Sequence, residues 1–482
     1  MKKYLFILLA VFAAQQAVQA QGFRVTLNAP QVRTGIAYLT YYLGPNLNIA
    51  DSAAAGSNGV TVFSGTKKLL PGIYVLVFPG KHSRIEFLID KSQKINISAP
   101  DTMDLVNKVV ITGSPENIPY SQYQKFVSTK GMMLIKEKNA YLSSRTRADS
   151  VLHEKNYNTL TKELNDYRQG IIVKQPKSML SALLSAMKDP KLPKGIPVTN
   201  RDSVNQYYYY KNHYWDDISF MDDRIIRTPF FVTKLERYYK DVLPKDADSV
   251  IKDADYKLLL ARSAPEMFKY LLNWLTDEYI NPEYMGMDKV FVHLFEKYHS
   301  KGISNWLNEK QMEAITRRAY MLMSNLVGEK GANLEMLDRN DKPTALYDLQ
   351  SDYTVLCFWD PNCGHCKTEI PRIDSIYQAS WKQKGVKIYA VFTPDGNAVT
   401  RADWAKFINS HNLNDWTHVY QSKEKEDADL KAQIPSFKQL YDVITTPTLY
   451  LLDSDKRIIG KKLTFLQLDG LLNAKRENKK PN

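Results

Sequence analysis

Three cysteines carry the most distinctive chemistry of this sequence. Cys357, Cys363 and Cys366 lie within ten residues of one another in a chain of 482. Three cysteines are too few, and an odd number, for a scaffold of structural disulfides. Two residues separate Cys363 from Cys366, so their thiols are within reach of one disulfide bond. We therefore predict reversible thiol–disulfide chemistry at this pair.

The segments around the pair predict how it is positioned. Residues 353–359 (YTVLCFW) are almost continuously apolar, as in a central strand buried on both faces. A helix is expected from Cys363 to about Trp381. Cys363 would then face unpaired backbone N–H groups and the positive end of the helix dipole, which favour a thiolate. We predict that Cys363 is the exposed nucleophile and that Cys366, one turn later, is the shielded thiol that resolves the mixed disulfide.

Strands and helices alternate through the rest of this region. Such alternation, followed by a hairpin and a final helix, predicts an α/β layout with one sheet between helices. The expected strands are 387–392, 417–421, 448–452 and 457–461, and the expected helices are 401–411, 435–441 and 466–476.

Residues 334–475 resemble the thioredoxin domain of the TlpA/ResA-like periplasmic thiol–disulfide oxidoreductases. The matching stretch runs from Val355 to Pro371 (VLCFWDPNCGHCKTEIP). Pro371 matches the helix-kinking proline of thioredoxins, and Thr446-Pro447 matches the loop whose cis proline lies beside the cysteine pair. In that family the loop backbone pairs with the bound substrate. The resemblance therefore implies a thioredoxin fold, with Thr446, Pro447 and Trp359 as substrate-binding residues.

Two positions differ from the general thioredoxin pattern. Cys357 occupies the place of a buried Asp six residues before the first cysteine. We expect it to be a reduced core thiol, the alternative being a third redox thiol. Glu369 matches a Glu of the TlpA/ResA-like branch, which implies proton exchange with Cys366, because positions i and i+3 share a helix face. The alternative is a surface carboxylate that pairs with Arg372 or Lys367.

His365 bears on the direction of the reaction. A positive charge between the cysteines would stabilise the Cys363 thiolate, favour the reduced pair and raise its potential. The CGHC sequence is found in oxidants and isomerases of the superfamily, whereas the TlpA-like scaffold points to a reductant. We expect an oxidoreductase that acts on protein disulfides, with reduction as the main direction. The alternatives are an oxidant or isomerase, and a binding or scaffold protein whose thioredoxin fold is not catalytic.

The preceding sequence predicts further domains and export. Residues 1–20 combine a basic start, an apolar run and small residues before Ala20, which predicts a signal peptide cleaved there and a periplasmic protein. Short strands in residues 21–115 predict a β-sandwich, and helical spacing in 116–330 predicts an all-α domain. The thioredoxin-like domain would occupy 331–482. The layout resembles exported bacterial proteins in which domains of unknown function precede a thioredoxin module.

Composition limits the classes of protein and of partner. Hydrophobic residues make up 44% and charged residues 24%, which excludes wholesale disorder and a multi-span membrane protein. The formal charge of +13 is best explained by a solvated basic surface, and we expect no nucleic acid partner. The expected partners are disulfide- or thiol-bearing exported proteins, with a membrane electron donor or acceptor as a further candidate; no oligomeric state is assigned. No organic cofactor is expected, and one CxxC supplies too few ligands for zinc.

Overall fold

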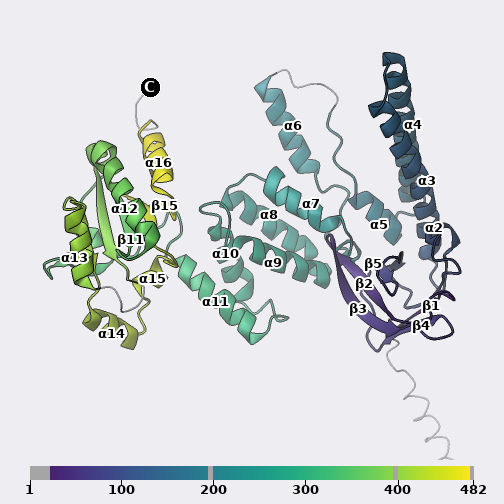
Figure 1. Ribbon diagram of the computed structural model, residues 1–482, viewed down its shortest axis with the longest axis horizontal. Helices are drawn as coiled ribbons and strands as arrows, with labels where there is room; N and C mark the ends of the chain where they lie inside the picture. Colours follow the sequence, from purple (N-terminus) through teal and green to yellow (C-terminus); the bar gives the residue numbers. More distant parts are fainter. Residues whose placement is uncertain (1–21, 194–198, 395–399, 478–482) are drawn as a thin grey trace, which may run out of the picture. The chain divides into compact units, whose positions relative to one another are not determined.

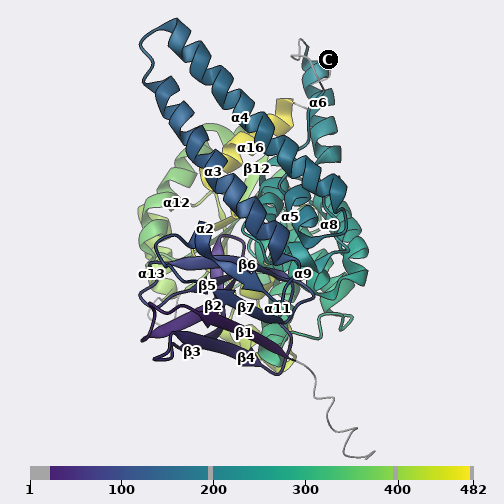
Figure 2. The same cartoon turned by 90° about the vertical axis from the view of Figure 1, so that its right-hand side faces the viewer.

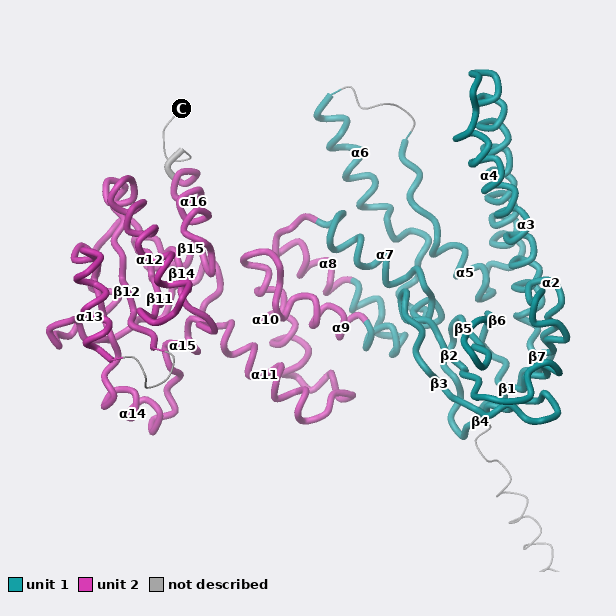
Figure 3. Tube along the Cα trace, in the orientation of Figure 1, with its two compact units in different colours: residues 1–243, 257–270 teal, residues 244–256, 271–482 magenta. Residues whose placement is uncertain are grey.

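The computed structural model describes residues 22–193, 199–394 and 400–477 (Figure 1). The predicted signal peptide, residues 1–20, lies outside these ranges. The chain divides into two compact units, one of residues up to 243 together with 257–270, the other of 244–256 and 271 onward (Figure 3). In the described ranges, no helix combines the length and the apolar composition needed to cross a bilayer.

The first unit begins with a β-sandwich, which confirms the predicted fold of this region. Its two four-stranded sheets have the orders β4-β1-β7-β8 and β3-β2-β5-β6. Side chains of both sheets, among them Val25, Leu39 and Phe87, meet in one fully buried core. The sequence did not predict β3, which pairs with β2 at a sheet edge. The strands are β1 (Phe23–Asn28), β2 (Ile36–Leu43), β3 (Asn46–Ala54), β4 (Val60–Gly65), β5 (Gly72–Val77), β6 (Arg84–Ile89), β7 (Lys94–Ser98) and β8 (Val110–Thr112).

Helices follow the sandwich, as predicted. Helices α3 and α4 form a long antiparallel pair (Figure 2), in which Phe126 stacks on Tyr167 at 4.0 Å between ring centroids. The pair is attached to the sandwich at Asn117, whose side-chain amide donates to and accepts from the backbone of Leu88. The helices are α2 (Leu105–Lys108), α3 (Asn117–Leu142), α4 (Arg147–Lys174), α5 (Met179–Ala186), α6 (Asn200–His213) and α7 (Phe231–Arg237).

The next helices lead into the second unit. Helices α8 (Ala247–Leu260) and α9 (Pro265–Tyr279) contribute to both units, and α9 begins at Pro265, a residue that suits the first turn of a helix. Helices α10 (Asp288–Leu294) and α11 (Glu309–Met323) belong to the second unit alone. Helix α11 begins after Asn308, which forms a reciprocal capping box with Gln311.

The rest of the second unit is a seven-stranded sheet with helices on both faces. The sheet order is β10-β9-β13-β12-β11-β14-β15, with β11 parallel to β12 and antiparallel to β14. This is the predicted α/β domain, including the hairpin of β14 and β15. Its strands are β9 (Glu335–Asp338), β10 (Pro343–Ala345), β11 (Tyr353–Trp359), β12 (Val386–Phe392), β13 (Thr417–Tyr420), β14 (Thr448–Asp453) and β15 (Ile458–Lys461); its helices are α12 (Gly364–Ile376), α13 (Arg401–Ser410), α14 (Lys423–Lys431), α15 (Phe437–Leu440) and α16 (Phe465–Glu477).

Strand β11 lies in the middle of this sheet and separates two hydrophobic cores. Val355, Cys357 and Trp359 belong to the core on the face covered by α12, α13 and α16. Leu356 and Phe358 belong to the core on the other face, against α15. All seven residues of β11 are buried, as the apolar run predicted.

Buried charges join helices α10 and α11 to the sheet within the second unit. The ammonium group of Lys461, on β15, donates to Asp288 and, at 2.7 Å, to Oδ1 of Asn325. Burial lowers the pKa of Lys461, although Asp288 favours its charged form. Nearby, Arg318 donates to Asp442 at 2.7 Å. These contacts are costly to break singly, because each leaves an unpaired charge in the interior.

We predict that Asp288→Ala lowers the free energy of unfolding by about 3–5 kcal/mol, because Lys461 would remain buried without its counter-ion. Urea unfolding of the full-length protein, followed by circular dichroism, measures this loss. The control is Glu426→Ala, which breaks an exposed pair with Lys423 and should change stability by less than about 0.5 kcal/mol. Equal losses in the two variants would show that Lys461 is solvated.

Candidate active site

Cys363 occupies the position just before helix α12. After β11 the chain turns, and the N–H of Cys363 donates to the carbonyl oxygen of Asp360 at 3.2 Å. The helix then begins, with Cys363 as its N-cap. Its side chain is partly exposed, and its Sγ donates to the carbonyl oxygen of Thr446 at 3.2 Å. The thiol therefore lies where the predicted nucleophile was expected, at the helix start.

Cys366 lies one turn into the helix and is fully buried. Its Sγ accepts a hydrogen bond from the backbone N–H of Asp360 at 3.5 Å. Both cysteines carry free thiols in this structure. The two sulfurs thus share one end of the helix but differ in their access to solvent.

Their ionisation differs in the same sense. Burial alone would raise the pKa of Cys363, but hydrogen bonds from the Thr446 side chain and from the backbone N–H groups of Cys366 and His365 lower it below its ordinary value. Burial instead raises the pKa of Cys366 to about 12. One thiol is therefore prepared to attack and the other is held protonated, which is the division of labour in thiol–disulfide exchange.

A groove of about 700 Å³ opens beside the pair. It is lined by His365 and Glu369 of α12 and by residues 445–448. The peptide bond between Thr446 and Pro447 in this loop is cis. The structure therefore brings together four of the residues that the sequence singled out, next to Cys363.

Glu369 is half-buried at the groove. Its carboxylate accepts a hydrogen bond from Arg372 at 3.3 Å, which is the pairing named in the alternative interpretation. It also lines the groove that contains the proline loop.

Two residues of β11 lie beneath the site. Trp359 has no exposed surface and packs on Phe407 with ring centroids 5.3 Å apart. Because β11 is buried on both faces, the Trp359 side chain supports the site from the core. The expected contact of this side chain with the substrate is therefore not made. Cys357 is also fully buried, and burial raises its pKa well above the ordinary value. This burial favours the core thiol over the redox thiol.

Sequence reasoning did not identify Asp360 as part of the site. It is only 3% exposed, and its backbone contacts both reactive cysteines. Its carboxylate accepts the N–H of Asn362 at 2.8 Å and so stabilises the turn. The sequence offered one indication of this role, because Asp360 is a polar residue directly after a buried strand. Asp442, Lys462 and Leu463 also line the groove, and nothing near the cysteines in sequence points to them.

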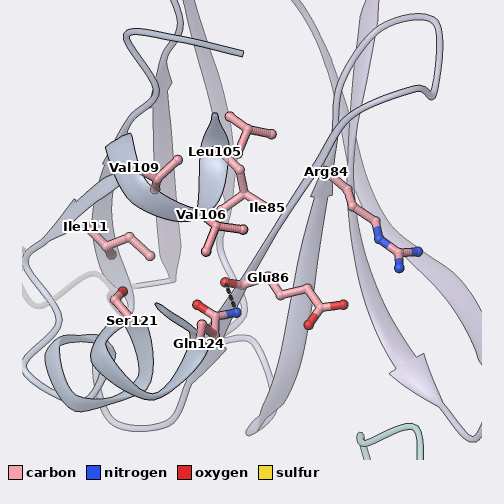
Figure 4. Close-up of a pocket in the computed structure, with 9 residues that line it drawn as sticks. All are labelled: Arg84, Ile85, Glu86, Leu105, Val106, Val109, Ile111, Ser121 and Gln124. Carbon is pink, nitrogen blue, oxygen red and sulfur yellow. Dashed lines mark hydrogen bonds between the residues drawn. The ribbon is translucent and has the colours of Figure 1, made fainter. Parts of the chain in front are cut away.

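A hollow in the first unit offers no comparable chemistry. It measures about 180 Å³ and lies between β6, α2 and α3 (Figure 4). In Figure 4 the side chains of Leu105 and Val106 face this space, whereas the guanidinium of Arg84 points away. Gln124 is occupied by a hydrogen bond to the carbonyl oxygen of Glu86 at 3.3 Å. This mostly apolar lining contains no nucleophile of the kind found at Cys363.

Three protein families match successive parts of the chain. Residues 327–461 match the AhpC/TSA family. Residues 153–325 match a domain of unknown function, DUF5106, and residues 23–120 match another, DUF4369. The two upstream matches carry no known activity.

Curated relatives and solved structures also match parts of this chain. The thiol-disulfide oxidoreductase ResA of Bacillus anthracis is 28% identical over 150 residues, which are 30% of this chain and 76% of that protein. ResA of Oceanobacillus iheyensis is 32% identical over 131 residues, 27% of this chain and 59% of that protein. A solved domain of a possible thiol-disulfide isomerase from Cytophaga hutchinsonii is 34% identical, with 32% of this chain and 95% of that chain covered and a TM-score of 0.27. A thioredoxin-like protein from Bacteroides caccae is 24% identical. The match covers 60% of this chain and 99% of that chain, with a TM-score of 0.45.

We predict that iodoacetamide modifies Cys363 first at neutral pH. Because its pKa is lowered, a larger fraction of Cys363 is thiolate at neutral pH than for an ordinary cysteine. Only the thiolate attacks iodoacetamide. Cys366 and Cys357 should react only after denaturation. Mass spectrometry of the reduced protein between pH 6 and 9 measures the three rates, and Cys363→Ser should remove the fast phase. Equal rates at Cys363 and Cys366 would contradict the assignment.

The family matches and the geometry concern the same residues. The pair Cys363 and Cys366 lies inside the AhpC/TSA match, between a buried central strand and a helix start. Residues 327–461 of this chain thus match the AhpC/TSA family, form a thioredoxin-like domain, and the chain is similar to the ResA thiol–disulfide oxidoreductases.

Proposed function

We propose that this chain is an exported thiol–disulfide oxidoreductase that reduces disulfides of other exported proteins through Cys363 and Cys366. The observation that carries the proposal is the opposite displacement of the two thiol pKa values at one helix start, lowered at Cys363 and raised at Cys366. Export rests on the leader-like residues 1–20. The electrons would come from a dithiol donor, for which a membrane protein is a candidate.

The reaction proceeds in two exchanges. The Cys363 thiolate attacks one sulfur of the substrate disulfide, a mixed disulfide forms, and the other substrate sulfur leaves as a thiolate. Cys366 then loses its proton and attacks Cys363 Sγ, which releases the second substrate thiolate. The substrate gains two electrons and the cysteine pair becomes a disulfide. Because Cys366 has a pKa of about 12, its deprotonation is the step that needs assistance.

Neighbouring side chains have roles in this scheme. Glu369 is the proposed proton acceptor, since its carboxylate lines the groove beside the pair. His365 is exposed between the cysteines and would add positive charge near Cys363 when protonated. Thr446 and Pro447 would hold the substrate backbone, because their loop forms the groove wall where Cys363 meets the Thr446 carbonyl.

The same geometry favours a second direction. Groups that stabilise the Cys363 thiolate stabilise the reduced pair, which raises the reduction potential. The lowered pKa of Cys363 and the adjacent His365 both act in this sense. An oxidant or isomerase is therefore the second candidate function, with the same atoms and the electrons moving from substrate to the pair.

We predict that Cys363→Ser abolishes reduction of insulin disulfides and that Cys366→Ser traps a mixed disulfide between Cys363 and its substrate. The first change removes the nucleophile, and the second removes the thiol that releases it. Turbidity measures insulin reduction, and non-reducing electrophoresis detects the trapped adduct. Cys357→Ala serves as the control, with activity retained if Cys357 is only a core thiol.

A scaffold function predicts different results for these cysteine variants. If the chain is a binding protein with an inactive thioredoxin fold, it should capture partners equally well without either thiol. Insulin reduction by Cys363→Ser at the wild-type rate would overturn the proposed function.

We also predict one two-electron redox transition, confined to Cys363 and Cys366. Titration against glutathione and dithiothreitol buffers, followed by alkylation and mass measurement, gives its midpoint. A midpoint potential of about −270 mV supports reduction, and one between about −180 and −120 mV supports oxidation or isomerisation. Absence of a reversible transition would contradict both.

A further inference from the structure

The groove at the cysteine pair adjoins a second hollow. The two hollows share the lining residues Asp442, Lys462 and Leu463. The second measures about 370 Å³ and extends away from the proline loop. Its far wall comes from the segment between α9 and α10, residues 281–286, which precedes the sheet by some fifty residues in sequence. A molecule bound at Cys363 can therefore extend past Lys462 towards this segment.

The segment presents two large side chains to this hollow. Tyr284 is 44% exposed and Met285 is 41% exposed, and both line it. Gly286 follows with a φ of +84°, a conformation that favours glycine and turns the chain into α10. The Met285 sulfur accepts a hydrogen bond from the backbone N–H of Lys461 at 3.3 Å, so the segment is held against β15. The exposed surface is thus a fixed wall of the hollow.

The charged groups of the hollow largely neutralise one another. Asp442 is paired with Arg318 at 2.7 Å and with Lys462. Asp288 is paired with Lys461. Glu283 also lines the hollow, so its three acidic and three basic side chains balance and leave little net charge to attract an ionic ligand. The Tyr284 ring, with the Lys245 ammonium 4.0 Å from its centroid, completes the lining together with the Met285 and Leu463 side chains, and such groups bind apolar side chains of a polypeptide.

We propose that residues 281–286 form a second part of the substrate site and bind apolar residues that flank the reactive cysteine of a partner polypeptide. The inference rests on the proposed function, because the partner is held by its sulfur at Cys363. The shared wall of the two hollows and the neutralised charges select a polypeptide over a small ion. The helical region thus acts as a specificity element for the thioredoxin domain.

The length of a substrate peptide decides whether it can contact both Cys363 and residues 281–286. An extended peptide covers about 3.3 Å per residue, so a tetrapeptide spans about 13 Å and a dodecapeptide about 40 Å. The probes are two such peptides with one central cysteine joined to 5-thio-2-nitrobenzoate, the longer with leucines on both sides. The reduced Cys363 thiolate attacks the peptide sulfur, the bond to the aryl sulfur breaks, and the coloured aryl thiolate leaves.

The experiment compares the second-order rate constants of aryl thiolate release from the long and short peptides in a single turnover of the reduced full-length protein. We expect the wild type to prefer the long peptide about fivefold to tenfold. Tyr284→Ala and Met285→Ala should each reduce this ratio, and the double variant should bring it close to one. Leu430→Ala is the matched control, because Leu430 is 76% exposed in the same unit but lines neither hollow, and it should keep the wild-type ratio.

The outcomes separate this inference from the proposed function. An unchanged ratio in the double variant, or no preference in the wild type, overturns the role of residues 281–286. In a further version of the long peptide the leucines are replaced by serines. If this version keeps the full preference over the short peptide, recognition of apolar side chains is overturned. Failure of the wild type to release the aryl thiolate from either peptide overturns the proposed function itself. Thermal unfolding of each variant confirms that the ratio is measured on folded protein.

Discussion

Strand β11 is hydrogen-bonded along both edges and buried on both faces, and the geometry of the reactive site depends on this constraint. The strand cannot shift by one residue without exchanging its two faces between different cores. Its last residue, Trp359, therefore fixes where the chain turns. Asp360 holds that turn through its backbone, and Cys363 falls at the helix start. The separation of the two thiol pKa values follows from this placement.

Much of this arrangement could be predicted because local composition and burial agree there. The apolar run 353–359 has few alternatives to a central strand, and a CxxC directly after it leaves the first cysteine at the N-cap. The same holds for α11, where Asn308 and Gln311 satisfy each other's backbone groups locally. In these segments the interactions that decide the structure lie within a few residues of one another.

Other elements escaped prediction because their side chains carry little signal. Strand β3 has no fully buried residue and is held by backbone pairing with β2 at a sheet edge. Helix α14 buries none of its residues and gains support from charge pairs such as Lys425 with Asp429. Trp359 was expected by resemblance to be a substrate-binding residue, although its strand position places it in the core. The proline loop could be located, but the groove around it could not, because Asp442 and Lys462 are distant in sequence from the cysteines.

The junction between α10, α11 and β15 sets a limit on how this protein can be rearranged. Lys461 and Asp288 are far apart in sequence but share one buried contact, and Ile458 exchanges backbone hydrogen bonds with Gly328 and Glu329. A chimera that received a foreign thioredoxin module after residue 330 would separate each charge from its partner. Such modules should therefore pass between proteins of this architecture together with α10 and α11. A substitution at Asp288 should be accompanied in related sequences by one at position 461.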